Sequence, residues 1–537
     1  MKLLLAVALL IASFPRLLPT QAATVFGQIV DDKSHKTLPA RMYIQSDAGK
    51  WFFPTSVSSN GTAVRYQKQH GKFTNSVEQH TTLSAHPFRV ELDPGTYTLT
   101  VERGKEYAPL TRHFGVSSEP KQMLLELHRW IDMAGRGWFS GDTHTHRNPA
   151  DLPNVMLAED VNVVHPMIYW TTADDVPPSR STQNFRGDFG AEPFRVDATH
   201  VWYPRNTEYE IFTTAKQKHT LGAILAINHK TVFDMPVLPI SRVAARAHAE
   251  GALLDLEKHN WEWSMAIVPL VKPDLFELAN NHLWRAEFGI RDWAVPAPAW
   301  MGLGNGLSSE REWAGYGFAN YYALLDCGFR LRPAAGTANG VHPVPLGFGR
   351  VYVHLDGRFS YEAWMKALDA GRSFVTTGPM LFATVDGKLP GEKFKSKPGA
   401  ARRVTVSGSV VSEYADNTLE IVSNGEMVQR LKLEAKRNRE GAFEVKFQHV
   451  LEISGTSWVA VRVWEERPGG RMRFAHTAPF WFEAAGVPLR PRRQEVEWLV
   501  QRVKDEITRS APLLPPEALA EYRQAQAVYE AMLAEAR

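Results

Sequence analysis

The sequence predicts a multidomain protein in which an α/β region lies between two β-rich regions and is followed by a helical tail. Three observations lead to this fold class. The chain of 537 residues is too long for one ordinary domain. Two stretches alternate apolar and polar residues, as half-buried strands do, and they flank a region in which strand-like and helix-like runs alternate. The C-terminal stretch spaces its apolar residues at the helical period.

The N-terminal segment, 1–23, is typical of a secretory signal peptide. Lys2 supplies the positive region, an apolar run over 3–14 follows, and Ala22 and Ala23 offer small residues for cleavage near either position. The apolar run is too short to span a bilayer comfortably. We therefore expect a periplasmic or secreted protein with no membrane span after cleavage. An N-terminal anchor that stays attached is the alternative.

Segment 24–130 is expected to form an N-terminal β-sandwich. The runs "TVFGQIVDD" and "QMLLELHRW" have the alternation of half-buried strands. In "FRVELDPGTYTLTVERG", the tripeptide "DPG" separates two alternating runs and predicts a hairpin-type turn.

Segment 131–391 is expected to form a β/α barrel. The runs "EDVNVVHPMIYW" and "LGAILAINHK" are typical of buried strands, whereas "SRVAARAHAEG" and "SYEAWMKALDAG" are typical of short helices. Repeated helix and strand units predict a parallel sheet, and their number favours a closed barrel over an open sheet.

The remaining chain divides into a second β-sandwich and a helical tail. Segment 392–485 returns to alternation in runs such as "RVTVSGSVV" and "SWVAVRVWEE". Segment 486–537 contains two amphipathic helical runs separated by Pro515 and Pro516. We expect this tail to dock against the rest of the protein. A partner-binding coiled coil is the alternative, but the apolar seam is too short for sustained heptads.

Charge and cysteine content narrow the function classes. The formal net charge is +3, with 61 basic and 58 acidic residues well mixed along the chain, so no nucleic-acid partner is expected. Cys327 is the single cysteine, which excludes a disulfide within the chain. A packing role in the protein interior is expected for it rather than nucleophilic catalysis.

The stretch "GWFSGDTHTHRNP" places Asp142, His144 and His146 at alternate positions. Side chains at i, i+2 and i+4 of a strand point to one side, so the two imidazoles would lie close enough to share a metal ion. An H-x-H pair by itself is also common on ordinary surface strands. Its meaning therefore depends on where the other histidines fall.

Four more apolar runs end in histidine, at His165, His229, His259 and His282. In a parallel barrel the carboxyl ends of all strands meet at the face that carries the active site. Independent surface histidines have no reason to prefer strand ends, so these positions favour a metal centre at that face. Imidazole suits zinc, iron and related metals.

Two acidic residues, Glu208 and Glu210 in "RNTEYEIF", share one face of a predicted strand. Carboxylates favour manganese or bridge two ions, so either residue is a candidate bridging ligand. The other residue would then belong to a charged edge strand.

The stretch "GWFSGDTHTH" resembles the D-x-H-x-H opening of the polymerase-and-histidinol-phosphatase (PHP) superfamily, and the closer likeness is to its exported CehA/McbA-type metallohydrolases. The resemblance covers most of the chain and includes, in the same order, "VERGKEYAPL", "LLDLEKHNWEW", "ELANNHLWR", "CGFRLRPAAGTANGVHPVPLGFGRVYV" and "GRSFVTTGP". It implies a distorted seven-stranded β/α barrel. It also implies one to three divalent transition-metal ions (zinc, manganese or iron) that activate a hydroxide for hydrolysis.

The resemblance also implies roles for individual residues. His144 and His146 match the first pair of metal ligands, and Glu208 matches the bridging carboxylate, with Glu210 as the alternative register. Asp142 would lie behind the ligands and orient an imidazole through its free N–H. Two further histidines match ligand positions of the family, namely His219 and His259. Weaker candidates from the strand-end pattern are His165, His229 and His282.

The sequence departs from the PHP pattern in two places. Active members commonly finish with an Asp-x-His pair, whereas "AGTANGVHP" has Asn339 where the aspartate is expected, with His342 displaced. The loop after His146 lacks the usual next histidine. Asparagine is a poorer ligand than a carboxylate and cannot act as a base. A mononuclear site, a binuclear site and a degenerate binding site are therefore alternatives to a complete trinuclear one.

Several residues near the strand ends are candidates for contact with a substrate. Lys230, Lys258 and Arg285 could offset the negative charge of a phosphate or carboxylate, or they could be solvated charges at the rim. Trp261 could stack on a sugar or an aromatic ring, or it could pack the barrel mouth. Other aromatic residues in the same position are Tyr169, Trp170, Trp263 and Trp284. We expect a small-molecule or carbohydrate substrate.

Three hypotheses about function follow. The first is an exported metal-dependent hydrolase that acts on an ester, carbamate or phosphoester. The second is a barrel with the amidohydrolase layout, which also begins with H-x-H. That layout requires a bridging lysine, for which Lys230 and Lys258 are imperfect candidates. The third is a non-catalytic envelope or carbohydrate-binding protein with a degenerate barrel.

Overall fold

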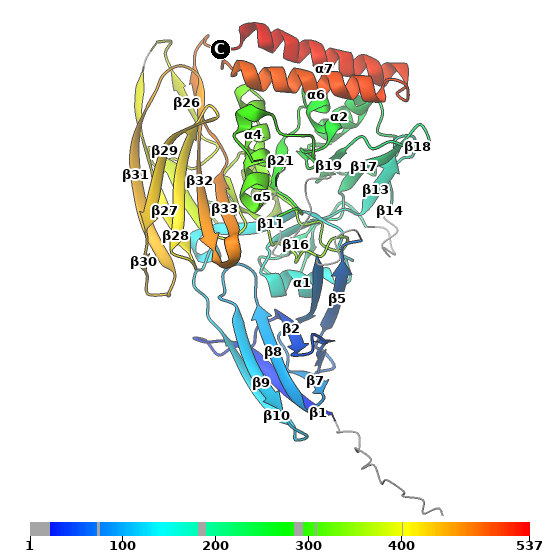
Figure 1. The fold of residues 1–537 in the computed structure, drawn as a ribbon, viewed down its shortest axis with the longest axis vertical. Coiled ribbons are helices and arrows are strands. Elements are labelled where there is room, and N and C mark those ends of the chain that lie inside the picture. Colours follow the sequence, from blue (N-terminus) through cyan, green and yellow to red (C-terminus); the bar gives the residue numbers. More distant parts are fainter. Residues whose placement is uncertain are drawn as a thin grey trace, which may run out of the picture.

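The computed structural model describes residues 22–71, 76–180, 189–283, 294–304, 307, 309–399 and 401–537. Within these residues the protein consists of several β-sheets and seven α-helices. Figure 1 shows two N-terminal sheets that project from a larger body, in which sheets and helices lie side by side. Most of the predicted signal peptide, together with Trp284 and Arg285, lies outside the described residues.

The N-terminal region contains two sheets with the strand orders β10-β1-β7-β4 and β5-β6-β2-β8-β9, and β3 pairs with β2. The "DPG" tripeptide does not close a hairpin, because β7 pairs with β1 and β4 whereas β8 pairs with β2 and β9. It carries the chain from one sheet to the other, so that Val90 and Leu92 of β7 share one core with Tyr97 and Leu99 of β8. The strands are β1 (Ala23–Asp31), β2 (Ala40–Ser46), β3 (Trp51–Phe52), β4 (Thr55–Ser56), β5 (Ala63–Gln69), β6 (Val77–Leu83), β7 (Phe88–Leu92), β8 (Gly95–Glu102), β9 (Leu110–Val116) and β10 (Lys121–Leu127).

The middle region is built around two further sheets. One has the order β14-β13-β17-β19-β20-β21-β22, with β18 on β17, and the other begins β15-β16-β12-β11-β23-β24. The strands are β11 (Trp138–Thr145), β12 (Val163–Pro166), β13 (Tyr169–Ala173), β14 (Ser179–Arg180), β15 (Phe194–Arg195), β16 (Val201–Trp202), β17 (Thr207–Thr214), β18 (Gln217–Lys218), β19 (Ala223–Ile227), β20 (Leu253–Leu256), β21 (Leu275–Ala279), β22 (Arg332–Ala335), β23 (Arg350–His354) and β24 (Ser373–Thr376).

The middle sheets are only partly parallel. β11 pairs in parallel with β12, and β20, β21 and β22 pair in parallel with one another. β19 is antiparallel to both β17 and β20, so the expectation of a wholly parallel sheet is wrong at this strand. Its carboxyl end, which precedes His229, points opposite to the carboxyl ends of its neighbours. The reason is the connection from β17 to β19, which is too short to hold a crossover helix.

The loop after β22 joins the two middle sheets at the end of β11. The His146 amide donates to the Asn339 carbonyl over 2.7 Å, and the Ala338 amide donates to the His144 carbonyl over 2.8 Å. Thr145 and Asn339 form an isolated parallel bridge. The end of β11 is therefore held from both sides, by β12 and by this loop.

Helices cover the middle sheets. They are α1 (Leu152–Glu159), α2 (Ile240–Glu250), α3 (Glu262–Val271), α4 (Glu310–Asp326) and α5 (Tyr361–Asp369). α4 begins with a capping box between Ser309 and Glu312, and α2 ends at Gly251, which has the positive φ of 72° that favours glycine. Cys327 caps the end of α4 and is half-buried rather than fully buried. Single-turn helices are η1 (Ala134–Arg136), η3 (Ala299–Met301) and η4 (Pro468–Gly470).

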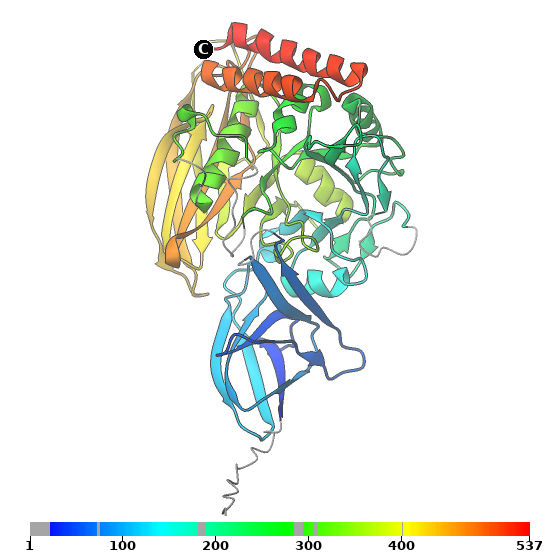
Figure 2. The same ribbon diagram turned by 45° about the vertical axis from the view of Figure 1, so that its right-hand side comes forward.

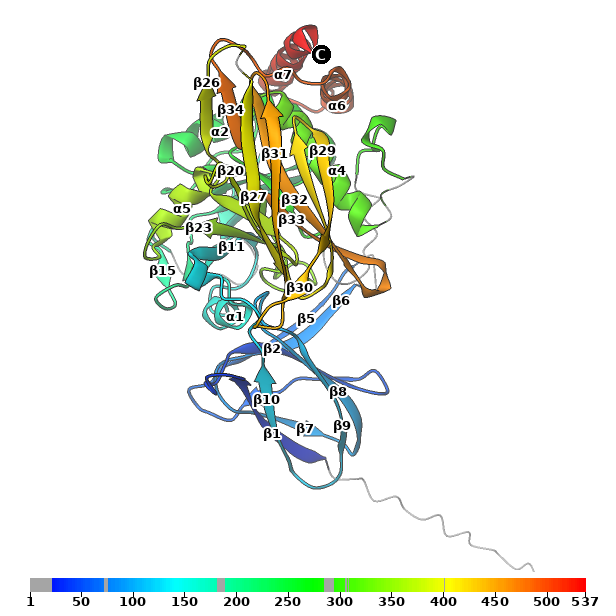
Figure 3. The same ribbon diagram turned by 90° about the vertical axis from the view of Figure 1, so that its left-hand side faces the viewer.

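The C-terminal β-layer continues one of the middle sheets. β24 pairs with β33, and the sheet runs on through β32 and β28 to β29, with β34 on β32 and β26 on β34. A second sheet, β25-β27-β31-β30, packs against it, and both are seen in Figure 3. The strands are β25 (Met380–Val385), β26 (Lys393–Ser396), β27 (Arg402–Ser412), β28 (Asp416–Ser423), β29 (Glu426–Glu434), β30 (Lys436–Arg437), β31 (Phe443–Ile453), β32 (Ser457–Arg467), β33 (Arg471–Thr477) and β34 (Phe480–Ala484).

The helical tail, α6 (Arg493–Ser510) and α7 (Pro516–Glu535), lies across the body in Figures 1 and 2. Trp498 donates to Asn320 of α4 over 3.1 Å, and the Tyr529 hydroxyl donates to the Met265 carbonyl of α3 over 2.9 Å. The tail therefore docks against the rest of the protein. Among the described residues, no helix is long and apolar enough to cross a membrane.

Candidate metal centre

The strand β11 carries polar side chains into the interior of the protein. All eight of its residues are buried, although Asp142, Thr143, His144 and Thr145 are polar or charged. Gly141 lets the strand approach α5 closely, because a Cβ atom there would lie 2.4 Å from the ring of Trp364. Burying polar groups costs free energy unless they are paired, so the contacts of these side chains define the site.

The two histidines of the "HTH" motif point at each other. The Nε2 atoms of His144 and His146 are 3.2 Å apart, and the side chains are 0% and 3% exposed. Two nitrogen ligands of a tetrahedral zinc ion, each at about 2.0–2.1 Å, lie about 3.3 Å apart. The pair therefore has the separation of two ligands of one metal ion.

Carboxylates from three other strands surround this pair. Glu208 of β17 lies 3.1 Å from His146 Nε2 and 3.7 Å from His144 Nε2. On the other side of the His144 ring, Glu257 and Glu277 approach Nδ1 at 2.8 and 3.0 Å. Glu257 directly follows β20, and Glu277 lies in β21.

We name these residues the His–Glu cluster: His144, His146, Glu208, Glu210, Glu257 and Glu277. Three sets of three within it have possible ligand atoms all within 4.8 Å of one another. The sets are His144, His146 and Glu208; His144, Glu257 and Glu277; and Glu208, Glu210 and Glu257. Both members of the predicted Glu208 and Glu210 pair therefore lie in the cluster.

The cluster and its surroundings hold more buried carboxyl groups than cationic groups. Four carboxylates around it are 1% exposed or less, namely Glu208, Asp255, Glu257 and Glu277. Lys258, which is 4% exposed, supplies one positive charge and lies 3.2 Å from Glu257 and 3.9 Å from Glu210. Buried charge is costly without a partner, so a divalent cation fits this surplus.

Burial and neighbouring charges shift the pKa values of the residues in the cluster. Burial raises the pKa of Glu208 to about 8, and the charge of Glu257 adds to the effect. Burial also disfavours the ionised form of Glu257, but Lys258 and His144 outweigh it and lower its pKa to about 2. Burial and the neighbouring His144 lower the pKa of His146 to about 3, which leaves this imidazole in the neutral form that binds metals.

Buried oxygen atoms without a partner also indicate that the cluster binds a metal ion. Among the described residues, Asp255 Oδ1 and Glu277 Oε1 are buried with neither a hydrogen bond nor an ion pair. Native proteins rarely leave buried polar atoms unsatisfied, and a missing ion is one explanation. Two imidazoles with several carboxylates form a donor set that suits zinc, manganese or iron. The residues present therefore fit a divalent metal site.

Asp142 lies beside the cluster and holds the backbone. Its carboxylate accepts hydrogen bonds from the amides of His144, Thr337 and Gly347 at 3.0–3.2 Å and from the Thr337 hydroxyl at 2.5 Å. The side chains that contact the His144 ring at Nδ1 are Glu257 and Glu277. Asp142 thus ties β11 to the loop after β22, whereas the two glutamates take the orienting role that the sequence suggested for it.

Four predicted ligands lie against other partners. His165 is 3.1 Å from the Tyr361 hydroxyl, and His219 is 2.8 Å from Ser510 of the tail. His229 contacts the Thr207 hydroxyl at 2.9 Å, because the antiparallel β19 turns it away. His259 stacks on Phe276, with the ring centres 5.2 Å apart. The structure does not bring these four rings into the His–Glu cluster.

Three further candidates lie near the cluster but outside it. The Asn339 side chain donates to the Val344 carbonyl over 2.6 Å, so its amide nitrogen is engaged in the loop. His342 stacks on His70 of the N-terminal region at 6.1 Å between ring centres. His282 packs against the Trp313 ring at 4.7 Å.

Three predicted substrate-binding residues, Lys258, Lys230 and Trp261, have different environments in the structure. Lys258 is part of the buried charge network rather than of a solvated rim. Lys230 is exposed. Trp261 is 6% exposed and packs against Phe212 at 5.7 Å, which favours the packing alternative.

Sequence reasoning missed Glu257, Glu277 and Asp255. A signal for them exists, since Asp255 and Glu257 alternate in "LLDLEKH" and Glu277 interrupts the apolar run "LFELA". An acidic residue inside a buried strand requires a partner. Attention to strand-end histidines drew the prediction to His259, which lies two residues after Glu257 and beyond the end of β20 at Leu256.

Solved structures resemble this protein at low sequence identity. One is a two-domain protein containing a predicted PHP-like metal-dependent phosphoesterase from Bacteroides vulgatus, at 11% identity and a TM-score of 0.32, covering 66% of this chain and 97% of that one. Another is a pilus 2b backbone protein of group B streptococcus, at 15% identity and a TM-score of 0.14, covering 20% of this chain and 41% of that one. A third is a β-glucuronidase of Parabacteroides merdae, at 9% identity and a TM-score of 0.15, covering 87% and 65%.

No family model matches the sequence, and no curated protein matches it. At these identities and TM-scores, the functional conclusion depends on the side chains of the His–Glu cluster alone.

Proposed function

We propose that the protein is an exported metal-dependent hydrolase of the PHP superfamily, CehA/McbA type, that acts on an ester, carbamate or phosphoester. The observation that carries the proposal is the 3.2 Å separation of the His144 and His146 Nε2 atoms, with Glu208 at 3.1 Å. A buried arrangement of this kind is a ligand set rather than a surface strand.

The protein's own residues would have three roles. His144, His146 and Glu208 would hold the ion, and Glu210 would hold a second ion together with Glu208 and Glu257. Glu257 and Glu277 fix the ring of His144 through Nδ1, which raises its basicity as a ligand. When bound, the ion supplies Lewis acidity toward a carbonyl or phosphoryl oxygen and lowers the pKa of water.

We also propose that the middle region forms the distorted seven-stranded barrel of that superfamily. The strands would be β11, β12 with β13, β17, β19, β20, β21 and β22 in that order. Support comes from the hydrogen bonds that join the end of β11 to the loop after β22. The N-terminal and C-terminal sheet pairs would be flanking β-sandwiches.

Export is proposed from the N-terminal segment. β1 begins at Ala23, which is 2% exposed and pairs with Leu92. Cleavage after Ala22 would leave this strand complete, whereas cleavage after Ala23 would remove its first residue. N-terminal sequencing of the secreted protein tests the position.

The amidohydrolase layout is the second candidate, because Lys258 is buried against Glu257 and Glu210 of the cluster. A carbamylated lysine in that layout bridges two ions, and Lys258 is 3.2 Å from Glu257. Mass spectrometry of the intact protein distinguishes the two, since carbamylation adds the mass of carbon dioxide. An unmodified Lys258 in active protein would exclude this layout.

Metal content and turnover of the mature protein test the proposal. We expect stoichiometric zinc, manganese or iron and hydrolysis of nitrophenyl phosphate, acetate or carbamate. The variant with both His144→Ala and His146→Ala should lose metal and turnover, whereas His113→Ala, at an exposed position on β9, should keep both. Protein that stays metal-free after reconstitution would overturn the metal site. Metal without turnover on any ester would favour the non-catalytic alternative.

A further inference from the structure

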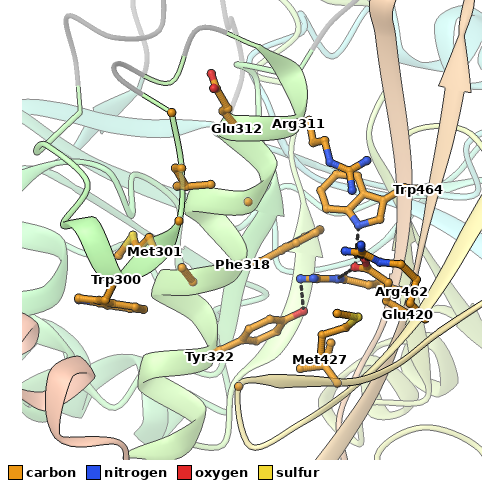
Figure 4. A pocket seen from close by; sticks show the side chains of 18 of the residues that line it. Trp300, Met301, Arg311, Glu312, Phe318, Tyr322, Glu420, Met427, Arg462 and Trp464 are labelled. Carbon is orange, nitrogen blue, oxygen red and sulfur yellow. Dashed lines mark hydrogen bonds and ion pairs between the residues drawn. The ribbon is translucent and has the colours of Figure 1, made fainter.

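A pocket lies away from the His–Glu cluster, between α4 and the C-terminal β-layer. It has a volume of about 450 Å³, within the range of small-molecule sites, and no residue of the His–Glu cluster lines it. Figure 4 shows Trp300 and Met301 on one side, with Arg462, Trp464 and Met427 on the other. Phe318 and Tyr322 of α4 lie between these two sides.

Aromatic rings form much of the wall of this pocket. Trp300 is the middle residue of η3, and Trp464 belongs to β32. Phe318 and Tyr322 are one turn apart on α4. The Trp300 side chain is half-buried, so part of its ring is available for contact. Phe318, Tyr322 and Trp464 are buried, so Trp300 is the ring in this wall that can stack on the flat face of a sugar or another ring.

Guanidinium groups supply positive charge beside these rings. Arg462 and Arg430 both pair with Glu420, at 2.7 and 2.6 Å. Arg311 lies over the Trp464 ring, 4.7 Å from its centre, and has no ion pair with any described residue. Of these three guanidinium groups, Arg311 is therefore the one that no carboxylate of a described residue engages.

The base of the pocket is held rigidly by buried groups. Glu420 is fully buried and also accepts a hydrogen bond from Trp464 Nε1 at 2.9 Å. Arg462 donates to the Tyr322 hydroxyl over 3.2 Å, and that hydroxyl lies 2.7 Å from His476 Nε2. Groups that are fixed before binding lose little entropy when a ligand arrives.

We propose that this pocket binds a ring that carries one carboxylate, with a uronic acid of an oligosaccharide as its source. The half-buried Trp300 ring would contact the face of the ligand ring, and the planar fork of Arg311 would bind the carboxylate through two N–H groups. Arg311 is the partner assigned to the anion because Glu420 already forms ion pairs with both Arg430 and Arg462. The volume of the pocket accommodates one or two sugar rings.

Calorimetric titration of the full-length mature protein tests this assignment. The probes are digalacturonate, the neutral disaccharide of galactose, and benzoate. We expect digalacturonate to bind, and the neutral disaccharide to bind at least about tenfold more weakly, since it lacks the ion pair. Arg311→Gln and Trp300→Ala should each weaken digalacturonate binding about tenfold.

Two controls separate this site from the proposed hydrolase. Arg523→Gln, at an exposed position of α7, should leave digalacturonate binding unchanged. The variant with both His144→Ala and His146→Ala should also bind as the parent does, so the pocket stands even if the metal site fails. Equal binding of the neutral sugar, equal binding by Arg311→Gln, or no binding of any probe would overturn the proposal. If the protein binds benzoate but not digalacturonate, the sugar assignment is overturned and the pocket is a site for aromatic acids.

Discussion

The Nε2 atoms of His144 and His146 face each other at 3.2 Å in the interior of the protein. Glu257 and Glu277 engage the opposite nitrogen of the His144 ring, so its Nε2 atom is turned toward the centre of the cluster. Two imidazole nitrogens at this distance share either one proton or one cation. The surrounding carboxylates favour a divalent cation.

Glutamine at position 219 should not affect metal content. His219 contacts Ser510 at 2.8 Å and lies outside the His–Glu cluster, although the family resemblance implies a ligand there. His219→Gln should therefore retain the metal of the parent protein, measured by elemental analysis, whereas His144→Ala should lose it. Loss of metal from folded His219→Gln would restore the family-based assignment.

Replacement of Glu257 by glutamine should weaken both the fold and the metal site. The change removes the charge that pairs with Lys258 and the acceptor that fixes His144. Breaking a buried ion pair from one side costs about 3–5 kcal/mol, and loss of an orienting partner lowers metal affinity about 10- to 100-fold. Urea unfolding and metal titration measure the two effects. The matched control is Glu452→Gln on β31, an exposed position that should change neither.

Removal of metal with a chelator should destabilise the protein. Without a cation, the buried carboxylates of the cluster repel one another. A ligand at 1,000 times its dissociation constant stabilises the folded state by about 4 kcal/mol. Thermal unfolding with and without chelator should therefore show a lower Tm for the chelated protein, recovered by zinc or manganese. An unchanged Tm, with metal removal verified by elemental analysis, would argue against a metal bound in the cluster.

Alanine at position 336 should disturb the cluster directly. A Cβ atom on Gly336 would lie 2.4 Å from both His144 Cβ and Glu277 Oε2, which forces one of them to move. We expect a loss of about 1–3 kcal/mol of stability and weaker metal binding. Gly357→Ala is the matched control, because no atom lies within 4 Å of a Cβ atom there. Equal metal affinity in the two variants would show that the close packing around Gly336 is not required.

The stability of the protein should fall as pH rises through the titration of His200. Burial lowers the pKa of this imidazole, but hydrogen bonds to Asp160 and Asp197 outweigh burial and raise it from 6.5 to about 9. The folded state therefore holds the proton more tightly than the unfolded state. The stabilisation is complete below pH 6.5 and is lost as the pH rises through about 9.

Urea unfolding at about pH 6 and about pH 9 measures this effect, which is at most about 3 kcal/mol. His200→Gln should be less stable than the parent at the lower pH and should lose less stability between the two values. A parent and variant with the same pH dependence would contradict the prediction.

The sequence by itself determined the local features of the site. Alternation in "GDTHTH" predicted that His144 and His146 share one side of a strand, and alternation in "TEYE" predicted the same for Glu208 and Glu210. Both predictions depend only on the two-residue period of a strand, so neighbouring residues are sufficient to make them. The helical period of the tail and the glycine that ends α2 are local in the same sense.

Only the tertiary structure decided which side chains meet. Glu257 and Glu277 reach His144 because β20 and β21 lie across from β11, a relationship between residues more than a hundred positions apart in the chain. His229 was lost from the predicted set because β19 runs antiparallel, and no periodicity reveals the direction of a strand in its sheet. His165, His219 and His259 end apolar runs or precede them, yet each packs elsewhere. Side-chain contacts between distant strands depend on how the sheets close, which is a property of the whole fold.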